Sequence, residues 1–79
     1  MRRSENRTMI IYTDHAEQRM TKRGIQKSWV EETIRKPDQV LVVRYGKEQA
    51  IKKVNHEEIS VVYVKEGDNW IVVTVFWGR

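Results

Sequence analysis

The sequence contains no cysteine, a single proline and no apolar run long enough to cross a membrane. Without cysteine the chain can form neither disulfides nor thiolate metal sites, which fits a reducing compartment. Its two histidines, His15 and His56, lie far apart and do not form a zinc site between them. Neither a phosphate-binding glycine loop nor a serine-nucleophile motif is present. We therefore expect a cytoplasmic protein without metal, cofactor or membrane contact.

Length and net charge limit the number of domains and the evidence for a nucleic-acid partner. The chain has 79 residues, enough for one small domain, and a formal net charge of +4. Half of that charge comes from residues 1–8, which are polar and aperiodic. We expect a disordered basic arm over 1–8 and one domain over 9–79. Because the domain itself is nearly balanced in charge, only a local basic patch can support binding to nucleic acid.

The segment 14–25 supplies such a patch on a predicted helix. Asp14 and Glu17 have the spacing of an N-cap with a capping box, and Gly24 is suited to a C-cap. At 100° per residue, Ala16 and Met20 form a narrow apolar stripe. His15, Arg19 and Arg23 form a basic ladder along one border of that stripe, and Lys22 lies beside His15 on the helical wheel. This border lies where a helix meets the core, and it is the main functional signal in the sequence.

Each member of this ladder has a catalytic and a structural interpretation. His15 falls in the first turn, where the helix dipole favours a neutral imidazole that can act as a base. Arg19 and Arg23 can bind phosphate oxygens, because guanidinium groups match their geometry. Alternatively, His15 is a partly buried histidine that only hydrogen-bonds a neighbour, and the arginines form ion pairs with Glu31, Glu32 or a carboxylate on a strand.

The rest of the chain is predicted to form a scaffold. Residues 26–36 have the pattern of a second helix whose core face carries Trp29, Val30, Thr33 and Ile34, and Pro37 ends it. Residues 9–12 form a strand or an extended entry. Four strands with short turns are then expected at 39–45, 48–55, 59–65 and 70–77. The predicted fold is α+β in the order ααββββ, with two N-terminal helices packed on a four-stranded antiparallel sheet.

Three features of the predicted sheet bear on function. Its last two strands are apolar on both faces, so a face with residues such as Val62, Val64 and Val72 or Val73 is left for a homodimer or another partner. Lys52 can serve the site or act as an ordinary surface lysine. Thr74 can offer a hydroxyl to the site or simply favour a strand.

The motif His15-Ala16-x-x-Arg19-Met20-x-x-Arg23-Gly24-Ile25 resembles the helix motif of an uncharacterised bacterial domain family. The resemblance extends over residues 11–77 and includes the closing segment 72–76. That family is grouped with the RelE-like and BrnT-like toxins of the barnase/colicin/RelE-type ribonuclease fold. The resemblance implies metal-free RNA cleavage through the 2′-hydroxyl and an antitoxin partner. It carries over to His15, Arg19 and Arg23, with Lys52 and Thr74 as further positions.

The sequence therefore favours a toxin-type endoribonuclease that is independent of metal. The catalytic candidates are His15 and Arg19, the phosphate-binding candidates are Lys22, Arg23 and Lys52, and Thr74 is a supporting candidate. Two alternatives remain open. One is a non-catalytic RNA- or ribosome-binding domain that uses the same basic ladder, and the other is a protein-interaction or dimerisation module that uses the apolar sheet face.

Overall fold

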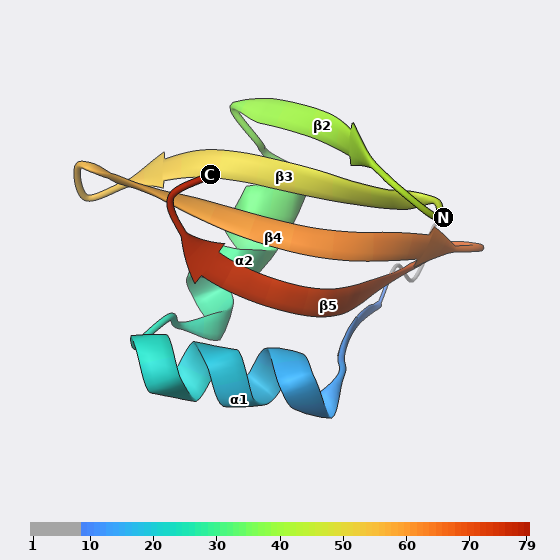
Figure 1. The fold of residues 1–79 in the computed structure, drawn as a ribbon, viewed down its shortest axis with the longest axis horizontal. Coiled ribbons are helices and arrows are strands. Elements are labelled where there is room, and N and C mark those ends of the chain that lie inside the picture. Colours follow the sequence, from blue (N-terminus) through green and yellow to red (C-terminus); the bar gives the residue numbers. More distant parts are fainter. Residues whose placement is uncertain (1–8) are drawn as a thin grey trace, which may run out of the picture.

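A computed structural model describes residues 9–79 of the chain (Figure 1). The arm expected over 1–8 lies outside the described residues. Two helices follow a short first strand, and four further strands complete the fold. The elements are β1 (Ile10–Tyr12), α1 (Asp14–Arg23), α2 (Lys27–Arg35), β2 (Gln39–Val43), β3 (Lys47–Val54), β4 (Glu57–Glu66) and β5 (Asn69–Trp77).

The strands form one mixed sheet in the order β1-β5-β4-β3-β2. β2 to β5 make the antiparallel meander expected from the short turns. β1, however, adds a fifth strand and pairs with β5 in parallel, so the prediction of a four-stranded antiparallel sheet was wrong. The α+β class and the two helices are as predicted. A three-residue run is too short to show a period, and its partner residues, Trp70 to Val72, lie at the other end of the chain.

Both helices pack on the same face of the sheet, where the core lies. Register places Ala50, Val61 and Val75 side by side on this face, and all three belong to the cluster that contains the buried helix residues. From α2, Val30, Thr33 and Ile34 are buried and Trp29 packs against the same cluster. The core face predicted for the second helix is therefore confirmed.

The opposite face of the sheet is only partly open. Val62 and Val64 lie on it and are half-buried, whereas Val72 lies on the helix side and is buried. On this face, near the end of β5, the Ser60 hydroxyl donates to the Gly78 carbonyl oxygen, and the Gly78 N–H donates to the Glu58 carbonyl oxygen. The chain end therefore folds back across the sheet there, as Figure 1 also shows.

Candidate functional site

The start of α1 is fixed to the middle of β5 by one residue, Thr13. Its hydroxyl accepts a hydrogen bond from the Ala16 N–H at 3.1 Å and donates one to the Val73 carbonyl oxygen at 3.2 Å. Its backbone N–H donates to the Val72 carbonyl oxygen at 3.1 Å. Thr13 is therefore the N-cap, and the prediction of Asp14 for that position was wrong by one residue. The Thr13 hydroxyl thus caps α1 and binds β5 at the same time.

The end of α1 is fixed to the last part of β5. Gly24 is the C-cap with a φ of 66°, as predicted, and the Ile25 N–H donates to the Met20 carbonyl oxygen at 2.9 Å. The Arg23 guanidinium donates from Nη1 to the Val75 carbonyl oxygen at 3.0 Å. The indole Nε1 of Trp77 donates to the Arg23 carbonyl oxygen, also at 3.0 Å.

These contacts lay α1 along the edge of β5 that β1 leaves uncovered, and both elements run in the same direction (Figure 1). Ten helical residues span about 15 Å. The strand from Val72 to Trp77 spans about 17 Å at roughly 3.3 Å per residue, so the two lengths match. Thr13 and Arg23 bind carbonyl oxygens of this edge, which would otherwise be open to pairing with another strand.

His15 and Arg19 form a hydrogen-bonded pair one turn apart on α1. The Nε atom of Arg19 donates to Nε2 of His15 at 3.3 Å. This bond requires an unprotonated Nε2, so the neutral imidazole carries its proton on Nδ1. His15 is exposed and Arg19 is half-buried. The pair therefore places an imidazole and a guanidinium side by side where solvent can reach them.

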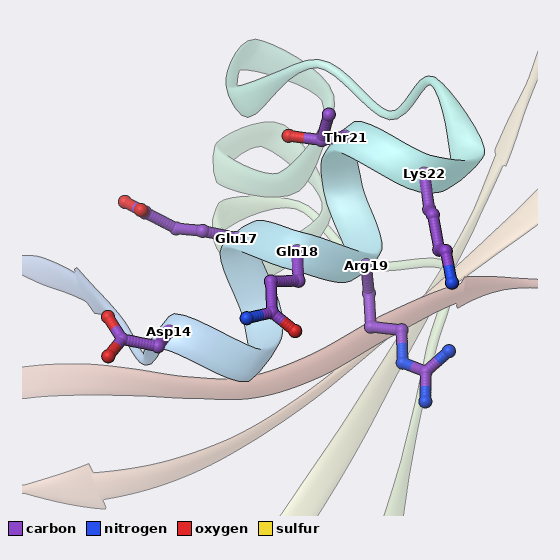
Figure 2. A pocket seen from close by; sticks show the side chains of 6 residues that line it. All are labelled: Asp14, Glu17, Gln18, Arg19, Thr21 and Lys22. Atoms are coloured by element: carbon purple, nitrogen blue, oxygen red, sulfur yellow. The ribbon is translucent and has the colours of Figure 1, made fainter.

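A shallow pocket extends along the outer surface of α1 (Figure 2). The residues that line it, as far as the described part of the chain shows, are Asp14, Glu17, Gln18, Arg19, Thr21 and Lys22. Figure 2 shows that the side chains of Arg19 and Lys22 extend to the same side of the helix, away from those of Asp14 and Glu17. The two cations thus form one basic surface, and the two acids lie near the N-terminal end of the helix, where the dipole favours them.

The flank of α1 that faces α2 has a different character. Glu17 and Lys27 form an ion pair at 3.7 Å, and the Lys27 ammonium lies 5.0 Å from the centre of the Tyr12 ring. The Tyr12 hydroxyl is buried and has no hydrogen-bond partner among residues 9–79. Burial, followed by the charges of Glu31 and Glu17, raises the pKa of Tyr12 to about 12. The cation on this flank, Lys27, is therefore engaged with one acid and one aromatic ring, whereas Arg19 and Lys22 form no ion pair among residues 9–79.

The structure does not bring Lys52 to the other site candidates. Lys52 lies on β3, two strands away from β5 and at the level of Trp77, whereas α1 begins beside Val72. Its Nζ atom donates to the Lys36 carbonyl oxygen at 3.1 Å, which supports the end of α2. Thr74 is in register with Val62 and so lies on the sheet face opposite the helices.

Two residues that position the ladder were missed at the sequence level. Thr13 carries three of the bonds that hold the start of α1, and Trp77 binds its end. The only signal for Thr13 was its place before Asp14, since threonine is itself a common N-cap. Trp77 gave no local signal, because its partner is the Arg23 backbone, 54 positions earlier in the chain.

Residues 9–79 contain no group of three or more histidine, aspartate and glutamate side chains placed to hold a metal ion. No helix in this part of the chain is long and apolar enough to span a membrane.

Comparison with known proteins places the chain in a family. Residues 12–77 match the family described as "Domain of unknown function (DUF4258)", and the chain belongs to that family. No curated protein matches it in sequence. Among solved structures, the chain is similar to the ribonuclease toxin BrnT of Brucella abortus, with a TM-score of 0.70 and 17% identity over 92% of this chain and 99% of that one. At this level of identity the similarity establishes a shared fold.

Proposed function

We propose that the protein is a toxin-type ribonuclease that cleaves RNA through the 2′-hydroxyl without a metal ion, and that an antitoxin protein is its partner. The observation that carries this proposal is the hydrogen bond between Arg19 and His15 on the exposed flank of α1. The fold shared with a ribonuclease toxin supports the proposal. A fold does not by itself determine the reaction, so the proposal rests on the side chains of the site.

In the proposed reaction His15 is the general base. Its Nε2 atom takes the proton of the 2′-hydroxyl, the 2′-oxygen attacks phosphorus, and the bond to the 5′-oxygen breaks. The products are a 2′,3′-cyclic phosphate and a 5′-hydroxyl end, with water supplying the proton to the departing oxygen. Because Nε2 accepts from Arg19 in the free protein, Arg19 must release it when RNA binds.

Arg19 then has a second role at the phosphate. Its guanidinium can move from the imidazole to the phosphate oxygens and stabilise the negative charge that develops there. Lys22, which extends to the same side of α1, binds a neighbouring phosphate. Arg23 donates to Val75 and mainly holds the helix in place, while its remaining N–H groups can contact RNA. Lys52 and Thr74 have no part in this mechanism.

The test is cleavage of single-stranded RNA and of ribosome-bound RNA in excess chelator, with the wild type, His15→Ala and Arg19→Ala. Each change is expected to lower the rate by on the order of 10²–10³, because one removes the base and the other a transition-state charge. Gln18→Ala, which changes a side chain of the same pocket, is the matched control and should cleave normally. A substrate with 2′-deoxyribose at the cleaved position should resist the wild type.

The outcomes separate the three candidate functions. Full cleavage by His15→Ala, or a need for added metal, contradicts the mechanism. If the wild type cleaves neither substrate but binds RNA in a salt-dependent manner, the non-catalytic RNA-binding domain is correct. If it neither cleaves nor binds RNA, the domain is a protein-interaction module.

A further inference from the structure

The two edges of the sheet differ in the elements that cover them. At one edge the outer strand is the three-residue β1, and α1 covers the rest of β5 (Figure 1). At the other edge the outer strand is the five-residue β2, which pairs only with β3 within the described residues (Figure 1). Of the six exposed large apolar side chains among residues 9–79, Met9 and Ile11 lie at the first edge, and four lie on β2 or in the turn that follows it. Their exposed fractions are 44% for Val40, 37% for Leu41, 86% for Val42 and 85% for Tyr45.

The sequence of β2 lacks the usual protection of an edge strand. Natural edges carry charges, prolines or bulges that prevent pairing with another chain. Gln39–Val43 reads Gln-Val-Leu-Val-Val, with no charge and no proline. Val40 and Val42 lie on the helix side of the sheet, in register with Ala50 and Glu48, yet they remain exposed. An uncovered apolar edge of this kind is suited to β-strand addition.

We propose that β2 pairs antiparallel with β2 of a second copy of this chain, about a two-fold axis at Leu41. In that register Val40 faces Val42 of the second copy, and the same contact is repeated by symmetry. One residue beyond the strand at each end, Asp38 faces Arg44 of the second copy, so opposite charges meet twice. This order of charges around an apolar centre is self-complementary, and it favours a second copy over an unrelated peptide.

One carboxylate oxygen of Asp38, Oδ2, accepts a hydrogen bond from the Lys53 N–H of β3 at 2.9 Å, on the side away from the open edge. The contact with Arg44 of the second copy would therefore be made by the other oxygen, Oδ1. Directly opposed opposite charges stabilise a strand pair, and like charges destabilise it. The flanking residues therefore select this register over one shifted along the strand.

The dimer would be a continuous ten-stranded sheet with the two copies of α1 near its opposite ends. The basic surfaces of α1 stay accessible in this arrangement, so dimerisation and RNA chemistry can be tested separately. A five-residue strand pair forms a small interface, and the dimer should therefore be reversible and depend on concentration.

The experiment is sedimentation of the full chain from micromolar to millimolar concentration. The wild type is expected to pass from monomer to dimer, and Val42→Lys should weaken the dimer by about tenfold or more because it places a charge in each of two equivalent contacts. Met9→Lys is the matched control, since Met9 is 57% exposed and lies next to the other edge of the sheet. Thermal unfolding of Val42→Lys should match that of the wild type, because this side chain is not buried.

Charge variants test the register. Arg44→Asp and Asp38→Arg should each dimerise less than the wild type, because each places like charges opposite one another. When the two variants are mixed, opposite charges face each other again and a heterodimer should form. A wild type that stays monomeric throughout, a dimer that is insensitive to Val42→Lys, or one that Met9→Lys dissociates would overturn the proposal.

Discussion

Arg19 donates a hydrogen bond to His15 from one helical turn away, at 3.3 Å, and so selects one tautomer of the imidazole. The acceptor is Nε2, which leaves the proton on Nδ1. This arrangement keeps the basic nitrogen beside the guanidinium that is proposed to bind the scissile phosphate. It also has consequences that can be measured without any substrate.

The first prediction concerns this tautomer. In neutral His15 the wild type should hold more of the Nδ1–H form than Arg19→Ala, because only the wild type has the donor for Nε2. Nitrogen-15 NMR of the imidazole rings measures the two forms directly. His56, in the turn between β3 and β4, is the internal control and should be unaffected. Equal tautomer populations in the two proteins would show that the hydrogen bond does not persist in solution.

The second prediction concerns Arg23 as an anchor of α1. Arg23→Ala removes the guanidinium bond to the Val75 carbonyl oxygen and should lower the free energy of unfolding by about 1 kcal/mol. Lys22→Ala, one residue earlier on the exposed side, should change it by less than about 0.5 kcal/mol. Urea unfolding followed by circular dichroism gives both values. If Arg23→Ala abolished RNA cleavage at unchanged stability, its main role would lie in the reaction.

The third prediction concerns the start of α1. Thr13→Ala removes the N-cap and the bond to Val73, and it should lower the free energy of unfolding by about 1–2 kcal/mol. Thr13→Ser keeps the hydroxyl and should retain most of the stability. Asp14→Ala should cost less than Thr13→Ala, since Asp14 is the first helical residue and not the cap. The reverse order would restore Asp14 as the cap.

The fourth prediction concerns alkaline pH. Burial and the hydrogen bond to Glu48, 2.8 Å from the Tyr63 hydroxyl, raise the pKa of Tyr63 to about 12. The unfolded chain loses this proton near pH 10, so above that pH the folded state binds more protons than the unfolded state. Stability should therefore fall as the pH rises from about 10 to about 12. Tyr63→Phe should reduce this fall, measured as melting temperature against pH, and an unchanged slope would contradict the assignment.

Local sequence patterns determined much of α1, α2 and the meander. The apolar stripe of Ala16 and Met20, the C-cap at Gly24 and the core face around Val30 and Ile34 are all found as expected. These features follow from spacing along one element, and a helical or strand period fixes which side chains share a face without reference to the rest of the chain. The adjacency of His15 and Arg19 has the same origin, because residues four apart meet on a helix.

Tertiary structure alone decided the features that join distant segments. β1 pairs with β5, Thr13 binds the Val73 carbonyl oxygen and Arg23 binds that of Val75, and each of these partners lies more than 50 residues away. Lys52 has the positive charge expected of a phosphate-binding residue, but it lies on β3, two strands from β5, whose edge α1 covers. Periodicity does not encode which strand becomes an edge or which carbonyl oxygens remain to be bound. The sequence by itself therefore determined which side chains share the flank of α1, and the sheet order determined which of them remain accessible.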